Sequence, residues 1–158
     1  DVKRLEREAR GQVADAEPGL LDSVPACLPA LMQAQKISKR AAKAGFEWDS
    51  LADVWDKVAE ERAEFEAEEQ GSEAAAAEFG DILFALVNVA RWCGVDAEEA
   101  LAASNRKFRR RWSRMEELAR EDGVAVEDLT TERQNELWDR AKAEEKRQGS
   151  PAARKALV

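Results

Sequence analysis

Apolar residues recur every three or four positions along most of this chain. Leu51, Val54, Trp55, Val58 and Phe65 follow that rhythm, which is typical of a helix buried along one face. With Ser, Asp and Thr as candidate caps and Gly as the terminator, the pattern predicts helices over about residues 29–44, 51–70, 73–93, 97–122 and 131–145. No stretch shows the sustained two-residue alternation of a strand. The fold class is therefore predicted to be all-α, a four- to five-helix bundle.

The division of the chain follows from the same pattern. We expect residues 1–24 to form an arm or linker, residues 25–146 to form one domain, and residues 147–158 to form a flexible tail. The segment from Ile82 to Ala90 is apolar nearly all round. We expect its outer, solvent-facing side to be buried against a second copy of the chain in a homodimer.

The apolar rhythm of the second predicted helix runs into carboxylates at position 61. At about 100° per residue, Glu60, Glu61 and Glu64 share one sector of that helix. Like charges that lie together and are partly buried lower the stability of the fold by roughly several kcal/mol unless a cation joins them. This cluster therefore predicts a cation site, and the alternative is a solvated face of a Glu-rich helix.

A second pair of carboxylates follows on the next predicted helix. Glu78 is in register with Ile82 and Ala85, and Asp81 lies three residues after Glu78 on the same side. If the two helices pack antiparallel, the two ExxE/D pairs face each other and offer hard oxygen ligands. Such ligands suit Mg²⁺, with Mn²⁺ as a possible substitute.

Composition narrows the chemistry. The chain of 158 residues carries a formal net charge of −8, which argues against nucleic-acid and anionic-membrane partners. It contains no His, which removes hydrolytic schemes that need imidazole. No apolar run is long enough to span a membrane and no signal peptide opens the chain, so we expect a cytoplasmic location. We expect Cys27, Cys93, Phe46 and Trp48 to be packing residues.

Basic and aromatic residues complement the carboxylates. Lys107 and Arg111 lie one turn apart on the fourth helix, and Lys57 lies one turn before Glu61. Lys142 follows Trp138 by one turn on the fifth helix. Carboxylates for a metal, nearby cations and a Trp face fit a nucleotide polyphosphate. Each basic residue taken singly is also consistent with a surface charge, and Trp138 with core packing.

These motifs together resemble a known family. Lys57-x-x-Glu60-Glu61-x-x-Glu64, Glu78-x-x-Asp81 and Asn105-x-Lys107-Phe108-x-x-Arg111, with the preceding segments 28–31 and 35–42, are similar to the MazG nucleoside triphosphate pyrophosphohydrolases. The resemblance implies an all-α dimeric enzyme. It implies Mg²⁺-dependent hydrolysis of ribo- or deoxynucleoside triphosphates to the monophosphate and pyrophosphate, which would clear or control nucleotide pools.

The resemblance also implies roles for individual residues. Metal ligands would be Glu61, Glu64, Glu78 and Asp81; Glu60 would bind a second ion or act with Glu61 in catalysis; Lys57, Lys107, Arg111 and Lys142 would contact phosphate; and Trp138 would contact the nucleoside. One departure is Ala77, where many members carry another acidic residue. Two alternatives stay open, a dUTP- or dCTP-specific all-α pyrophosphatase and a non-enzymatic acidic helical module that binds a basic partner.

Overall fold

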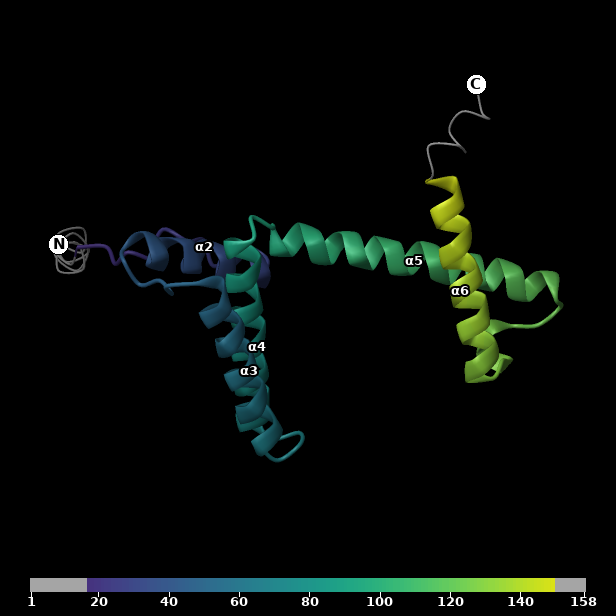
Figure 1. The fold of residues 1–158 in the computed structure, drawn as a ribbon, viewed down its shortest axis with the longest axis horizontal. Coiled ribbons are helices and arrows are strands. Elements are labelled where there is room, and N and C mark those ends of the chain that lie inside the picture. The colour runs from purple at the N-terminus through teal and green to yellow at the C-terminus, as the bar shows by residue number, and fades with distance from the viewer. Residues whose placement is uncertain (1–16, 150–158) are drawn as a thin grey trace, which may run out of the picture. The chain divides into compact units, whose positions relative to one another are not determined.

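A computed structural model describes residues 17–149. Within them the chain forms α-helices and one short 3-10 helix, and no strand. The helices are α2 (Ala30–Lys43), α3 (Leu51–Ala67), α4 (Glu73–Trp92), α5 (Ala97–Glu121), η1 (Val126–Asp128) and α6 (Thr131–Gln148) (Figure 1). The all-α prediction is therefore confirmed.

Hydroxyl side chains start three of these helices. Ser50 accepts a hydrogen bond from the backbone N–H of Asp53, Ser72 from that of Ala75, and Thr130 from that of Arg133. Each bond satisfies one of the N–H groups that the first turn of a helix leaves without a partner. Between α3 and α4 the chain turns at Gly71, whose φ of 81° favours a residue without a Cβ. The sequence thus fixes where the carboxylate-bearing helices begin and how they are joined.

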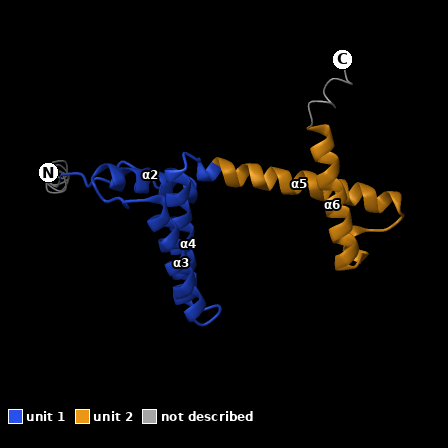
Figure 2. Ribbon diagram, in the orientation of Figure 1, with its two compact units in different colours: residues 1–98 blue, residues 99–158 orange. Residues whose placement is uncertain are grey.

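The chain divides into two compact units, residues 1–98 and residues 99–158 (Figure 2). In the first unit α3 and α4 pack side by side as a hairpin, and α2 packs against α4. Val54 on α3 and Ala85 and Val87 on α4 are buried. Small and β-branched side chains at these positions let the two helices approach closely, which brings their polar edges together.

A polar network ties α4 to the loop before α3. Arg91 donates to both carboxylate oxygens of Glu47 at 2.6 and 2.7 Å and to the Ser38 hydroxyl at 2.8 Å. The indole N–H of Trp92 donates to Glu47 at 3.0 Å. The Arg91 hydrogen bond, with that of Trp92, lowers the pKa of Glu47 to about 2. The loop is therefore fixed at the end of α4 by a carboxylate that stays ionised.

In the second unit a small core lies between α5, η1 and α6. Met115, Leu118, Ala119, Val126 and Leu137 form it, and Leu129 and Trp138 pack against it. Only the second half of the apolar stripe on α5 is buried. Met115 is 2% exposed there, whereas Leu101 and Phe108 in the first half are 51% and 55% exposed. α6 thus packs against the C-terminal half of α5, which carries Arg111.

Some expectations about packing are wrong. Cys27 and Cys93 are free thiols on the surface, and Phe46 is 80% exposed. Each lies in a short loop or at a helix end, where helical periodicity does not determine burial. On α4, Leu83, Phe84 and Leu86 are between 37% and 42% exposed. The homodimer that we expect to cover this face stays a prediction.

No helix among residues 17–149 combines the length and the apolar character that a membrane span requires.

Candidate functional site

Five carboxylates gather on the facing edges of α3 and α4. Each of two groups of three offers carboxylate oxygens that all lie within 4.8 Å of one another; the groups are Glu60, Glu61 and Glu64, and Glu61, Glu78 and Asp81. Glu61 belongs to both groups and is only 6% exposed, whereas Glu60, Glu64 and Asp81 are exposed. The structure therefore brings together every carboxylate that the two ExxE/D motifs placed on one face.

Lys57 lies inside this cluster. Its ammonium is 2.5 Å from a carboxylate oxygen of Glu61 and 3.1 Å from one of Glu60. The hydrogen bond to Glu61, with that to Glu60, raises the pKa of Lys57 above its usual range. The structure thus shows Lys57 as a partner of the carboxylates, one turn before them on the same helix.

The single positive charge of Lys57 does not neutralise the five carboxylates of the cluster. Desolvation and the negative charges of Glu61 and Glu78 raise the pKa of Glu64. A shift in this direction is what unscreened neighbouring carboxylates produce, and a divalent cation would reverse it. The donor set fits Mg²⁺ because all the candidate ligands are carboxylate oxygens that lie close together, with Glu60, Glu64 and Asp81 exposed to solvent around the buried Glu61. The same set fits Mn²⁺.

A second cluster, entirely within the second unit, surrounds Arg111. The Nε of Arg111 donates to Glu145 at 2.9 Å, and its guanidinium carbon lies 5.4 Å from the centroid of the Trp138 ring. The Phe108 ring lies 5.0 Å from the Trp138 ring, centroid to centroid. An aromatic face with a guanidinium over it is suited to a planar, anionic ligand such as a nucleotide.

The other predicted phosphate contacts stand apart from these interactions. Lys107 on α5 and Lys142 on α6 are exposed and form no ion pair within residues 17–149. Their charges are available to a ligand, but the structure gives no contact that orients them. The carboxylate cluster and the Arg111 cluster lie in different units.

Sequence reasoning missed Glu145 in the second cluster and gave no role in the site to Phe108, which it named only within a motif. Glu145 lies seven residues after Trp138 and three after Lys142, so helical spacing places all three on one face of α6. That spacing was the available signal. Its partner Arg111 lies 34 positions away, and no local pattern predicts a contact over that separation.

No family model matches the chain. Comparison with known proteins nevertheless finds clear relatives. The chain is 41% identical over 147 residues, 90% of its length, to a nucleoside triphosphate pyrophosphohydrolase of Escherichia coli. It is 40% identical over 115 residues, 73% of its length, to the nucleoside triphosphate pyrophosphohydrolase/pyrophosphatase MazG of Thermotoga maritima. It is also 49% identical over 150 residues, 93% of its length, to the Bacillus subtilis protein named uncharacterized protein YabN.

The chain spans only part of each relative, 55% of the Escherichia coli protein, 45% of the Thermotoga protein and 29% of the Bacillus protein. Within that part the similarity extends over most of the chain, so the resemblance indicated by its motifs is confirmed.

Proposed function

We propose, because this chain is a homologue of the MazG nucleoside triphosphate pyrophosphohydrolases, that it hydrolyses nucleoside triphosphates, ribo or deoxy, between the α- and β-phosphates. The products are the nucleoside monophosphate and pyrophosphate. The observation that carries the proposal is the carboxylate cluster, in which two groups of three share Glu61. A cluster of this kind suits a substrate that arrives as a Mg²⁺ complex.

Glu61, Glu64, Glu78 and Asp81 are the proposed metal ligands. Bound at these oxygens, Mg²⁺ would neutralise part of the triphosphate charge and polarise the phosphate that is attacked. Glu61 is nearly buried, so its position is fixed by packing. The exposed ligands around it leave open positions for phosphate oxygens and water.

Glu60 is the proposed proton acceptor, with Glu61 beside it. Its side chain is 56% exposed and within 4.8 Å of the other carboxylates of its group, so water reaches it. It takes a proton from the water that attacks the α-phosphorus. The new bond joins that oxygen to phosphorus, the α-β bridging bond breaks, and its electron pair leaves with pyrophosphate.

The cations complete the recognition of the substrate. Arg111, Lys107 and Lys142 bind phosphate oxygens, and Trp138 contacts the nucleoside. Lys57 lies 3.1 Å from Glu60 and 2.5 Å from Glu61, and its ammonium would contact phosphate in the loaded site. A homodimer and a cytoplasmic location remain part of this proposal, with neither nucleic acid nor membrane as partner.

Product analysis tests the proposal. The chain is incubated with Mg²⁺ and each common ribo- and deoxynucleoside triphosphate, and the products are separated by anion exchange. Monophosphate and pyrophosphate in equal amounts are expected, with no turnover in EDTA. A diphosphate with orthophosphate would show attack at the γ-phosphorus and contradict the proposal. Turnover of dUTP or dCTP alone would identify the narrower pyrophosphatase alternative.

A further inference from the structure

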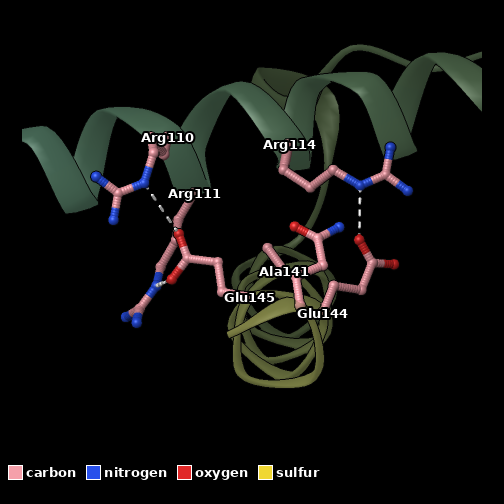
Figure 3. A pocket seen from close by; sticks show the side chains of 7 residues that line it. Arg110, Arg111, Arg114, Ala141, Glu144 and Glu145 are labelled. Atoms are coloured by element: carbon pink, nitrogen blue, oxygen red, sulfur yellow. Dashed lines mark hydrogen bonds and ion pairs between the residues drawn. The ribbon is translucent and has the colours of Figure 1, made fainter. Parts of the chain in front are cut away.

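Glu145 holds the guanidinium of Arg111 from one side. Its Oε2 accepts the Arg111 Nε hydrogen bond at 2.9 Å, and the Trp138 ring lies against the guanidinium with 5.4 Å to its centroid. The Arg111 side chain is only 15% exposed and that of Glu145 30% exposed. Figure 3 shows the pair at the edge of a cavity of about 220 Å³ between α5 and α6. Arg111 is therefore confined to one orientation by a carboxylate and a ring.

The hydrogen bond to Glu145 uses one of the five N–H donors of the guanidinium. The remaining four belong to the two terminal nitrogens of Arg111, which form no hydrogen bond within residues 17–149. In Figure 3 these nitrogens lie on the side of the guanidinium away from Glu145. Two parallel N–H groups directed outward are the geometry in which arginine binds a phosphate through two oxygens.

We propose that Glu145 is a positioning residue, which fixes Arg111 through Nε and presents its two terminal nitrogens to a phosphate of the nucleotide substrate. This inference rests on the proposed function and deepens it, since it adds a residue that acts on the substrate through another. The alternative is an ion pair that only stabilises the packing of α6 on α5.

The neighbouring glutamate provides a direct comparison. Both carboxylate oxygens of Glu144 are engaged, Oε2 by Arg114 at 2.7 Å and Oε1 by Arg140 at 3.4 Å. The Oε1 of Glu145 likewise lies 3.5 Å from the Arg110 Nε, an ion pair that forms no hydrogen bond. The two glutamates therefore differ in which arginine they hold by a short hydrogen bond. Glu145 holds Arg111, the proposed phosphate contact, whereas Glu144 holds Arg114.

An arginine that is held in place loses less conformational freedom when it binds a ligand. Without Glu145 the side chain of Arg111 would sample several rotamers, and each productive encounter would have to select one of them. We expect the cost to fall on substrate binding and to amount to about tenfold in KM, with kcat changed by less than about threefold.

The test compares six versions of the chain. They are the wild type, Glu145→Ala, Glu145→Gln, Arg111→Ala, the double variant Arg111→Ala/Glu145→Ala and, as the matched control, Glu144→Ala. Steady-state kcat and KM are measured with a Mg²⁺-nucleoside triphosphate that the wild type hydrolyses. Glu145→Ala should show the rise in KM. Glu145→Gln should recover most of the wild-type value, because an amide oxygen still accepts from Nε. Glu144→Ala should leave KM unchanged.

The double variant separates positioning from an independent effect. If Glu145 acts through Arg111, its removal should change nothing further once Arg111 is Ala. Equal effects of the Glu145 substitution in both backgrounds would overturn the inference, as would a wild-type KM for Glu145→Ala or an equal rise for Glu144→Ala. A wild type that releases no pyrophosphate from any nucleotide would refute the proposed function itself, and the inference with it.

Discussion

Replacement of Glu61 by Gln should separate the charge of this carboxylate from its shape. In EDTA two effects oppose each other. The variant loses the ion pair with Lys57, 2.5 Å long, and a charged hydrogen bond contributes about 1.5–3 kcal/mol. It also loses repulsion from four carboxylates whose oxygens approach within 4.8 Å. In a water-like dielectric each such pair costs about 0.9 kcal/mol, together about 3.5 kcal/mol.

The repulsion that is lost exceeds the ion pair that is lost by about 0.5–2 kcal/mol, so Glu61→Gln should melt no lower than the wild type when no metal is present. Addition of Mg²⁺ should then distinguish the proteins. At about 100 times the dissociation constant, a ligand stabilises the native state by roughly 2.7 kcal/mol, which raises the melting temperature by roughly 5–10 °C for a chain of this size. Because Glu61 belongs to both groups, its loss should weaken binding at least about tenfold. The stabilisation of Glu61→Gln by the same Mg²⁺ concentration then falls to about 1.4 kcal/mol, which raises its melting temperature by only roughly 3–6 °C.

Thermal unfolding followed by far-UV circular dichroism, in EDTA and in Mg²⁺, measures both quantities. Glu66→Gln is the matched control, because Glu66 lies on the same helix, is exposed and pairs with Arg62 outside both groups. It should keep the wild-type Mg²⁺ shift. Equal shifts for Glu61→Gln and the wild type would show that Glu61 is not a ligand. No shift in either protein would show that these carboxylates do not bind the ion before the nucleotide arrives.

Two further predictions concern the fold. Because the hydrogen bond from Arg91 lowers the pKa of Glu47 from 4.5 to about 2, Glu47 stabilises the folded state above pH 4.5 and loses that contribution as the pH falls toward 2. Glu47→Gln should therefore lower the free energy of unfolding at neutral pH by about 1–3 kcal/mol, and urea denaturation at decreasing pH should show the difference shrinking; a constant difference would contradict this. On the exposed apolar face of α4, Leu86 is 39% exposed, and Leu86→Glu should halve the mass measured by light scattering if the expected homodimer covers this face. A dimeric mass in the variant would place the interface elsewhere.

The sequence was sufficient to predict the helices and the carboxylate cluster because both depend on local spacing. Caps at Ser50, Ser72 and Thr130 determine where helices begin, and the spacing of Glu61 and Glu64 determines which face they share. Only one contact between helices, that of α3 with α4, was needed to bring the two ExxE/D pairs together, and the short turn at Gly71 favours it.

The sequence was not sufficient where a contact depends on packing between distant segments. Arg111 and Glu145 are 34 positions apart, and the way α6 crosses α5 decides which of Arg110, Arg111 and Arg114 faces which glutamate. Loops were misjudged for a related reason. Phe46 is apolar but 80% exposed, because hydrophobicity alone does not bury a side chain that no neighbouring element covers.

The position of Glu61 in both carboxylate groups bears on how freely the site can vary during evolution. Under the proposed function, a change at Glu60 or Asp81 removes a carboxylate from one group and leaves the other complete. A change at Glu61 removes a ligand from both at once, and no single second substitution restores them. Under the proposed function, the outer carboxylates should therefore tolerate substitution better than Glu61, which both groups share.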